Sequence, residues 1–95
     1  MLTVKRRVAV LMTCHNRRAL TEASVKSVKV AVDGAADAVI VLVDAGSSDG
    51  TAESVAAIDP AAQVLRRSPD LYWNSGMREA WAYALNQMPA FDFYL

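Results

Sequence analysis

An acidic, glycine-rich turn follows directly on an apolar segment in the middle of this chain. The apolar segment covers residues 39–43, and the turn reads Asp-Ala-Gly-Ser-Ser-Asp-Gly-Thr over residues 44–51. A continuous β-branched run predicts a strand that is buried on both faces, and in open α/β sheets ligands bind at the carboxyl ends of such strands. Asp44 could there accept hydrogen bonds from a nucleobase imide or a ribose hydroxyl, and the hydroxyl of Ser47 could donate to ligand oxygens.

Each residue of this turn also has a purely structural interpretation. Asp44 could close an Asx-type turn or cap a helix, and Ser47 could be solvated. Asp49 comes just before a predicted helix, where a carboxylate that caps free N–H groups contributes typically ~1 kcal/mol, so capping is its favoured role. Gly46 and Gly50 are predicted to adopt positive φ angles, which glycine tolerates best.

A polar segment follows the first apolar run of the chain, residues 8–12. Its members are Thr13, Cys14, His15, Asn16 and Arg17. Because parallel strands align their carboxyl ends, this segment should line one cleft together with Asp44. Arg17 is placed to bind a phosphate or to cap a helix. Cys14 is expected to be a small buried apolar residue. A catalytic Cys14–His15 pair is disfavoured, because neighbours in an extended loop point in opposite directions.

A third polar segment opens the clearest helix of the sequence, and it contains Trp73, Asn74, Gly76 and Met77. The free N–H groups and the positive dipole end of a helix suit an anion such as a diphosphate. Trp73 could stack on a base or a sugar, or it could plug the space under the loop. Trp81 falls on the apolar stripe of the same helix and is expected in the core.

These segments resemble one family in the right order. Residues 44–51 resemble the Asp-x-Gly-Ser-x-Asp-Gly-Thr signature of the family-two glycosyltransferases, inverting enzymes with a GT-A fold that use nucleotide-sugar donors. Residues 8–17 are similar to the opening strand and loop of that family, and residues 71–81 resemble the Tyr-Trp-x-x-Gly-Met segment of rhamnosyltransferase-like bacterial members. The resemblance covers nearly all of residues 7–95.

The resemblance implies that this chain carries the donor-nucleotide half of a GT-A domain. The parent enzyme would transfer a sugar from a nucleoside diphosphate, with inversion, to a hydroxyl of an acceptor saccharide or lipid-linked saccharide. In the family, Asp44 would contact the base or ribose, and the loop 13–17 would pack on the nucleobase and sugar. A divalent metal, Mg²⁺ or Mn²⁺, is expected for the full-length enzyme. Its Asp-x-Asp type ligands and the general base are expected beyond Leu95, so no catalytic residue and no metal ligand is predicted within this chain, which alone should be inactive.

Two other interpretations stay open. One is a non-catalytic nucleotide-binding or regulatory module of flavodoxin-like topology, which should have a polar final edge strand. The other is a truncated product without activity. The absence of a Gly-x-Gly-x-x-Gly motif after the first apolar run disfavours a dinucleotide fold, and no Lys follows the acidic turn, which excludes a P-loop.

The chemistry-bearing segments are connected by elements that alternate in type. Strands are predicted at residues 8–12, 38–43, 63–66 and 91–95, and helices at 20–32, 51–58 and 75–88. Such short connections predict a parallel sheet with helices on both faces, an α/β/α three-layer, Rossmann-like architecture. Gly34 is expected to stop the first helix. The predicted apolar faces are Leu20, Ala23, Ser24, Ser27, Val28 and Ala31 in the first helix, and Met77, Ala80, Trp81, Ala84, Leu85 and Met88 in the third.

Composition excludes several classes of protein. Ten basic and ten acidic residues cancel, so no electrostatic footprint for nucleic acid is present. The apolar runs are far shorter than the ~20 residues that span a bilayer, and no signal peptide is recognisable. A single cysteine without a signal sequence suits the cytoplasm, and the single histidine excludes a His-based metal cluster. The apolar final strand, residues 91–95, predicts self-association through an exposed edge.

Overall fold

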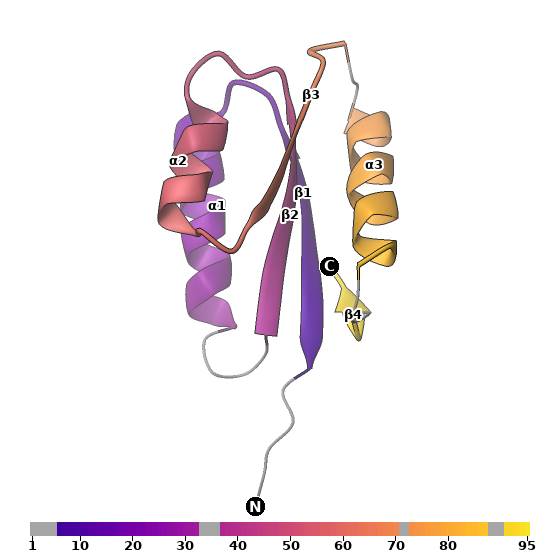
Figure 1. Ribbon diagram of the computed structural model, residues 1–95. Coiled ribbons are helices and arrows are strands. Elements are labelled where there is room, and N and C mark those ends of the chain that lie inside the picture. Colours follow the sequence, from indigo (N-terminus) through magenta and orange to yellow (C-terminus); the bar gives the residue numbers. More distant parts are fainter. Residues whose placement is uncertain (1–5, 33–36, 71–72, 88–90) are drawn as a thin grey trace, which may run out of the picture.

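The protein is an α/β fold built on one parallel sheet, as the sequence predicts. The computed structural model describes residues 6–32, 37–70, 73–87 and 91–95 (Figure 1). The strands are β1 (Arg7–Cys14), β2 (Asp37–Ala45), β3 (Gln63–Arg67) and β4 (Phe93–Tyr94), and they lie in the order β3-β2-β1-β4. The helices are α1 (Arg18–Ala31), α2 (Thr51–Ile58) and α3 (Trp73–Leu85). None of these helices has the length and apolar character needed to cross a membrane.

Helices cover both faces of the sheet, with α1 and α2 on one side and α3 on the other (Figure 1). Alternate residues of each strand therefore face different layers. One core cluster packs under α3 and consists of Ala9, Leu11, Val41, Val43, Ala80, Ala84 and Phe91. The other packs under α1 and α2 and consists of Val8, Val10, Val25, Ile40, Leu42 and Val55. Both faces of β1 and β2 are thus buried, which explains their nearly continuous apolar sequence.

The strand register brings the polar segments to one edge of the sheet. Cys14, the last residue of β1, pairs with Asp44 of β2, and Asp44 pairs with Arg66 of β3. The second neighbour of β1 is much shorter, because β4 pairs with it only at Val8 and Ala9. The carboxyl ends of β1 and β2 are therefore level, and the loops that follow them start side by side.

Several predicted boundaries are wrong by two or three residues. β1 and β2 both continue two residues further than predicted, so that Asp44 belongs to a strand and not to a loop. The reason is that parallel pairing between the two strands continues through Cys14 and Asp44. α2 has the predicted bounds, whereas α3 begins at Trp73 instead of Ser75. Gly34 and Met88 lie outside the described residues.

The predicted apolar face of α1 is only in part the buried one. Leu20 is 61% exposed, whereas Thr21 and Val25 are buried and Val28 is partly buried. The face toward the sheet therefore starts one residue later than predicted. A shift of one residue corresponds to about 100° of rotation about the helix axis, so the buried side is turned by slightly more than a quarter turn from the predicted one.

In α3, two small residues replace the expected aromatic contact with the sheet. Ala80 and Ala84 are fully buried, whereas Trp81 is 47% exposed and Leu85 is 54% exposed. Small side chains let the helix backbone approach the sheet closely, which leaves no space for an indole ring at this interface. Trp81 instead stacks against Tyr94, with ring centroids 5.1 Å apart. The prediction that Trp81 lies in the core is therefore wrong.

Candidate functional site

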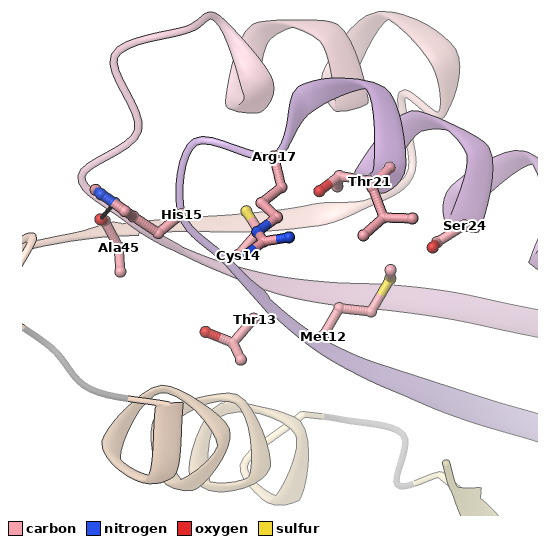
Figure 2. Close-up of a pocket in the computed structure, with 9 residues that line it drawn as sticks. Met12, Thr13, Cys14, His15, Arg17, Thr21, Ser24 and Ala45 are labelled. Carbon is pink, nitrogen blue, oxygen red and sulfur yellow. Dashed lines mark hydrogen bonds between the residues drawn. The ribbon is translucent and has the colours of Figure 1, made fainter.

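A pocket of about 440 Å³ opens beside the carboxyl end of β1, below the first turns of α1 (Figure 2). Figure 2 shows Arg17, Thr21 and Ser24 on the α1 side of the pocket, and Thr13 on the opposite side, toward α3. The residues that line the pocket are Met12, Thr13, Cys14, His15, Arg17, Leu20, Thr21, Ser24 and Ala45. Its position agrees with the rule that ligands of open α/β sheets bind at the carboxyl ends of the strands.

The pocket contains only part of the predicted site. Thr13, Cys14, His15 and Arg17 line it, whereas Asn16, Asp44, Ser47, Gly76 and Met77 are not among the lining residues. Sequence reasoning missed the contribution of α1, which supplies Leu20, Thr21 and Ser24. A signal for it exists in the sequence: Thr21 and Ser24 follow Arg17 by four and seven residues, a spacing that places all three on one helix face.

The polar side chains that α1 and its N-cap residue direct to the pocket have no partners among the described residues. Thr21 is only 5% exposed, yet its hydroxyl forms no hydrogen bond within the part of the chain that the structure describes. The same holds for the hydroxyl of Ser24 and for the guanidinium of Arg17. No side-chain nitrogen or oxygen of the described residues is buried without a partner, so these three groups reach solvent. They are therefore available to a ligand that offers oxygen acceptors.

Asp44 lies next to the pocket and is only 3% exposed. Its Oδ1 atom accepts a hydrogen bond from the backbone N–H of Ser47 at 3.0 Å and one from the Cys14 thiol at 3.9 Å. Asp44 therefore does close the turn, as the structural interpretation of this residue predicts. Both of these bonds end on Oδ1, so neither of them occupies Oδ2.

Cys14 is a half-buried residue that packs against the apolar cluster under α1. Burial, and next the charge of Asp44, raise the pKa of the Cys14 thiol to about 11. The thiol is therefore protonated at neutral pH, where it donates to the Asp44 carboxylate. This state supports the interpretation of Cys14 as a packing residue and not as a nucleophile.

The loop after β1 is hydrogen-bonded to the turn after β2. The Nδ1 atom of His15 lies 2.5 Å from the carbonyl oxygen of Ala45, and because a carbonyl only accepts, this nitrogen carries the proton. The N–H of Asn16 donates to Ser47 Oγ at 2.9 Å, and the N–H of Ser48 donates to Asn16 Oδ1 at 2.7 Å. Asn16 has a φ of 48°, a left-handed conformation that asparagine tolerates better than most residues.

Asp49 caps α2, as predicted, because its Oδ1 accepts the N–H of Thr51 at 3.1 Å and also the Thr51 hydroxyl. The structure adds a second cap, because Asp49 Oδ2 accepts the N–H of Arg18, the first residue of α1, at 3.1 Å. The hydrogen bond from the Thr51 hydroxyl is the largest of the effects that lower the pKa of Asp49. Asp49 is thus an ionised acceptor shared by two helices.

The glycines of the site allow close approaches of the backbone. Gly46 and Gly50 have φ angles of 67° and 82°, as predicted. A Cβ atom on Gly46 would lie 2.5 Å from the Pro69 side chain. At Gly76, a Cβ atom would lie 2.5 Å from Oγ1 of Thr13, so this glycine lets the start of α3 pack directly on the end of β1.

The start of α3 is in contact with the sheet. Met77 is partly buried against the core cluster under this helix, so Gly76 and Met77 both have packing roles, and ligand contacts by them stay predictions. Trp73 and Asn74 are the first two residues of α3, and their side chains lie outside the described part of the structure.

Comparison with known proteins gives one result. The model of a protein family described as "Glycosyl transferase family 2" matches residues 9–91. Searches of curated proteins and of solved structures each found no match. The matched range contains the whole pocket, the acidic turn and α3.

Proposed function

Because this chain belongs to glycosyl transferase family 2, we propose that the pocket beside β1 binds the nucleoside diphosphate part of the sugar donor. The observation that carries the proposal is a set of side-chain hydrogen-bond donors in this pocket that have no partner in the described part of the chain: Arg17, Thr21 and Ser24. Membership of the family implies a nucleotide-sugar donor, and such a donor is rich in oxygen acceptors.

The first support is the place and size of the pocket. It opens where β1 and β2 end, the edge at which open α/β sheets bind nucleotides. Its volume of about 440 Å³ falls within the roughly 300–1,000 Å³ typical of small-molecule sites. Apolar contact from Met12 and Leu20 on its walls suits a sugar or base face.

The second support is the chemistry of the first turn of α1. The N–H of Arg18 is bonded to Asp49 and that of Thr21 to the carbonyl of Arg17. The N–H groups of Ala19 and Leu20 have no helical acceptor, because the first N–H groups of a helix never do. Together with the Arg17 guanidinium, which can bind phosphate oxygens in a bidentate manner, they form a donor-rich end for the diphosphate.

Asp44 is proposed to hold the nucleoside through its Oδ2 atom, which would accept a hydrogen bond from a base imide or a ribose hydroxyl. Oδ1 keeps the turn closed through Ser47 at the same time. The base is proposed to be uracil or thymine. The rhamnosyltransferase-like subgroup, inversion at the anomeric carbon and an acceptor that is a saccharide or lipid-linked saccharide belong to this proposal as well.

The family typically uses a divalent metal. Within the described residues, no three His, Cys, Asp or Glu side chains are grouped so that they could hold one. The described residues therefore do not fit a metal site, and the proposal assigns to them the binding and orientation of the donor only. Chelation of the diphosphate and the acceptor's general base are not assigned to any of them.

Calorimetric titration with uridine diphosphate tests the proposal. Arg17→Gln should weaken binding about tenfold, because it removes a charge-assisted contact of roughly 1.5 kcal/mol or more. Lys26→Gln is the matched control, since it removes the same charge from an exposed position of α1 that does not line the pocket. Equal affinities of the wild type and Arg17→Gln would contradict the phosphate site. Equal affinities for uridine and its diphosphate would contradict it as well.

A further inference from the structure

Two loops that are far apart in the sequence form a single hydrogen-bonded unit, which we name the loop clasp. It joins residues 15–18, which run from the end of β1 to the first residue of α1, to residues 45–49, which start with the last residue of β2. His15 bonds to Ala45, Asn16 to Ser47 and Ser48, and Arg18 to Asp49. The clasp lies directly behind the pocket, because His15 and Ala45 belong to both.

Within the loop clasp, the carboxylate of Asp49 accepts hydrogen bonds from the first residues of both α1 and α2. Oδ2 accepts the N–H of Arg18 at 3.1 Å, and Oδ1 accepts the N–H of Thr51 at 3.1 Å. The residues at the N-cap positions, Arg17 for α1 and Gly50 for α2, give no side-chain cap. The backbone carbonyl of Asp49 also accepts from the Arg18 guanidinium at 3.3 Å. Both carboxylate oxygens are thus engaged inside the protein.

The position of α1 decides the shape of the pocket. Arg17 immediately precedes the capped residue Arg18, and Leu20, Thr21 and Ser24 follow it on the first two turns. A change in the position of Arg18 relative to β2 would therefore move every α1 group that faces the pocket. We propose that Asp49 is a positioning residue for the donor site: it fixes the first turn of α1 against the end of β2 and does not contact the ligand. This inference rests on the proposed function of the pocket.

Ionisation of Asp49 is essential to this role. A carboxylate offers two acceptor atoms, one for each helix, whereas an amide offers one acceptor and one donor. Asp49→Asn can therefore satisfy Thr51 or Arg18 but not both. Glu53→Gln gives a matched control, because Glu53 also lies in the first turn of α2 and carries the same charge. In the described part of the chain its side chain accepts from the exposed Arg66, and it acts on Arg18 through charge, without a bond to the Arg18 N–H.

The experiment measures amide hydrogen exchange and affinity for uridine diphosphate in the same samples. For Asp49→Asn we expect at least about tenfold faster exchange at the Arg18 amide and about tenfold weaker binding, at a temperature where the protein is folded. Glu53→Gln should leave the Arg18 exchange rate and the affinity unchanged. If Asp49→Asn does not fold, Asp49→Ser carries the same test with the same expected result, because its single oxygen can still accept from Thr51.

The outcomes separate this inference from the proposed function. Faster exchange at Arg18 with unchanged affinity would overturn the positioning role and leave donor binding intact. Unchanged exchange at Arg18 would overturn the cap itself. A wild-type protein that does not bind uridine diphosphate would overturn the proposed function and, with it, the positioning role, while the exchange data would still report whether Asp49 holds Arg18.

Discussion

The loop clasp and the pocket lie side by side, and they differ in how their polar groups are satisfied. In the clasp, the side chains of Asn16, Ser47 and Asp49 bond to groups of the opposite loop or the next helix. In the pocket, the side chains of Arg17, Thr21 and Ser24 form no hydrogen bond with any described residue. The difference teaches that a polar motif at the end of a strand need not be the ligand contact. Much of the motif holds the loops in place through internal hydrogen bonds. The side chains that are left without partners lie beside the motif, in the pocket.

The largest effect on stability is expected for a substitution in the loop clasp that creates a clash which no side-chain movement can relieve. Gly46→Ala should destabilise the protein by about 2 to 4 kcal/mol, since it adds a Cβ atom against Pro69 and places alanine at a positive φ. Gly50→Ala is the control, because φ is also positive there but the nearest atom, at 3.1 Å, belongs to the flexible end of Arg18. Urea unfolding measures both. If both variants lose the same free energy of unfolding, the close approach of Pro69 to Gly46 makes no contribution to the loss.

A smaller and opposite pattern is expected in the pocket. Thr21→Val keeps the shape of the side chain and removes only its hydroxyl, which has no hydrogen bond within the described residues. Affinity for uridine diphosphate should fall by about 1 kcal/mol, roughly fivefold, while the free energy of unfolding stays equal or rises slightly. Calorimetry and urea unfolding give the two values. A loss of stability with unchanged affinity would mean that this hydroxyl stabilises the folded protein and does not bind the ligand. The pocket would then not differ from the loop clasp at this residue.

The smallest effect concerns Cys14, which lies at the boundary between the two regions. Burial, and next the charge of Asp44, raise the pKa of the Cys14 thiol from its ordinary value of 9.0 to about 11 in the folded protein. The folded state therefore holds the proton more tightly, so this contribution to stability is complete below about pH 9 and is lost as the pH rises toward 11. Alkylation of the native thiol should be slow at pH 8 and accelerate toward pH 11.

Cys14→Ser is the control for the stability measurement, because it removes titration at this pH. It should flatten the fall in stability above pH 9. An alkylation rate that already reaches its plateau at pH 9 would show that burial and the charge of Asp44 do not raise the pKa of the Cys14 thiol.

The sequence alone determined the elements and their order. Apolar runs of five or six residues, separated by glycine- and proline-containing turns, allow only short strands and helices, and α2 was predicted with its observed bounds. Local contacts were predictable for the same reason: the cap that Asp49 gives to Thr51 and the positive φ of Gly46 involve neighbours in the chain. The family resemblance was likewise readable from the order of three short motifs.

Tertiary structure decided which groups face one another. The bonds of Asn16 to Ser47 and of Arg18 to Asp49 join residues 31 positions apart, and only the β1–β2 register brings them together. The orientation of α1 was also beyond the sequence, because its apolar residues do not all face the sheet: Val25 is buried, whereas Leu20 and Val30 are exposed. A rotation by one residue exchanges exposed Leu20 for buried Thr21. The packing of α1 on the sheet therefore decides which hydroxyls lie in the pocket. This packing depends on contacts between residues far apart in the chain, which a local sequence pattern does not describe.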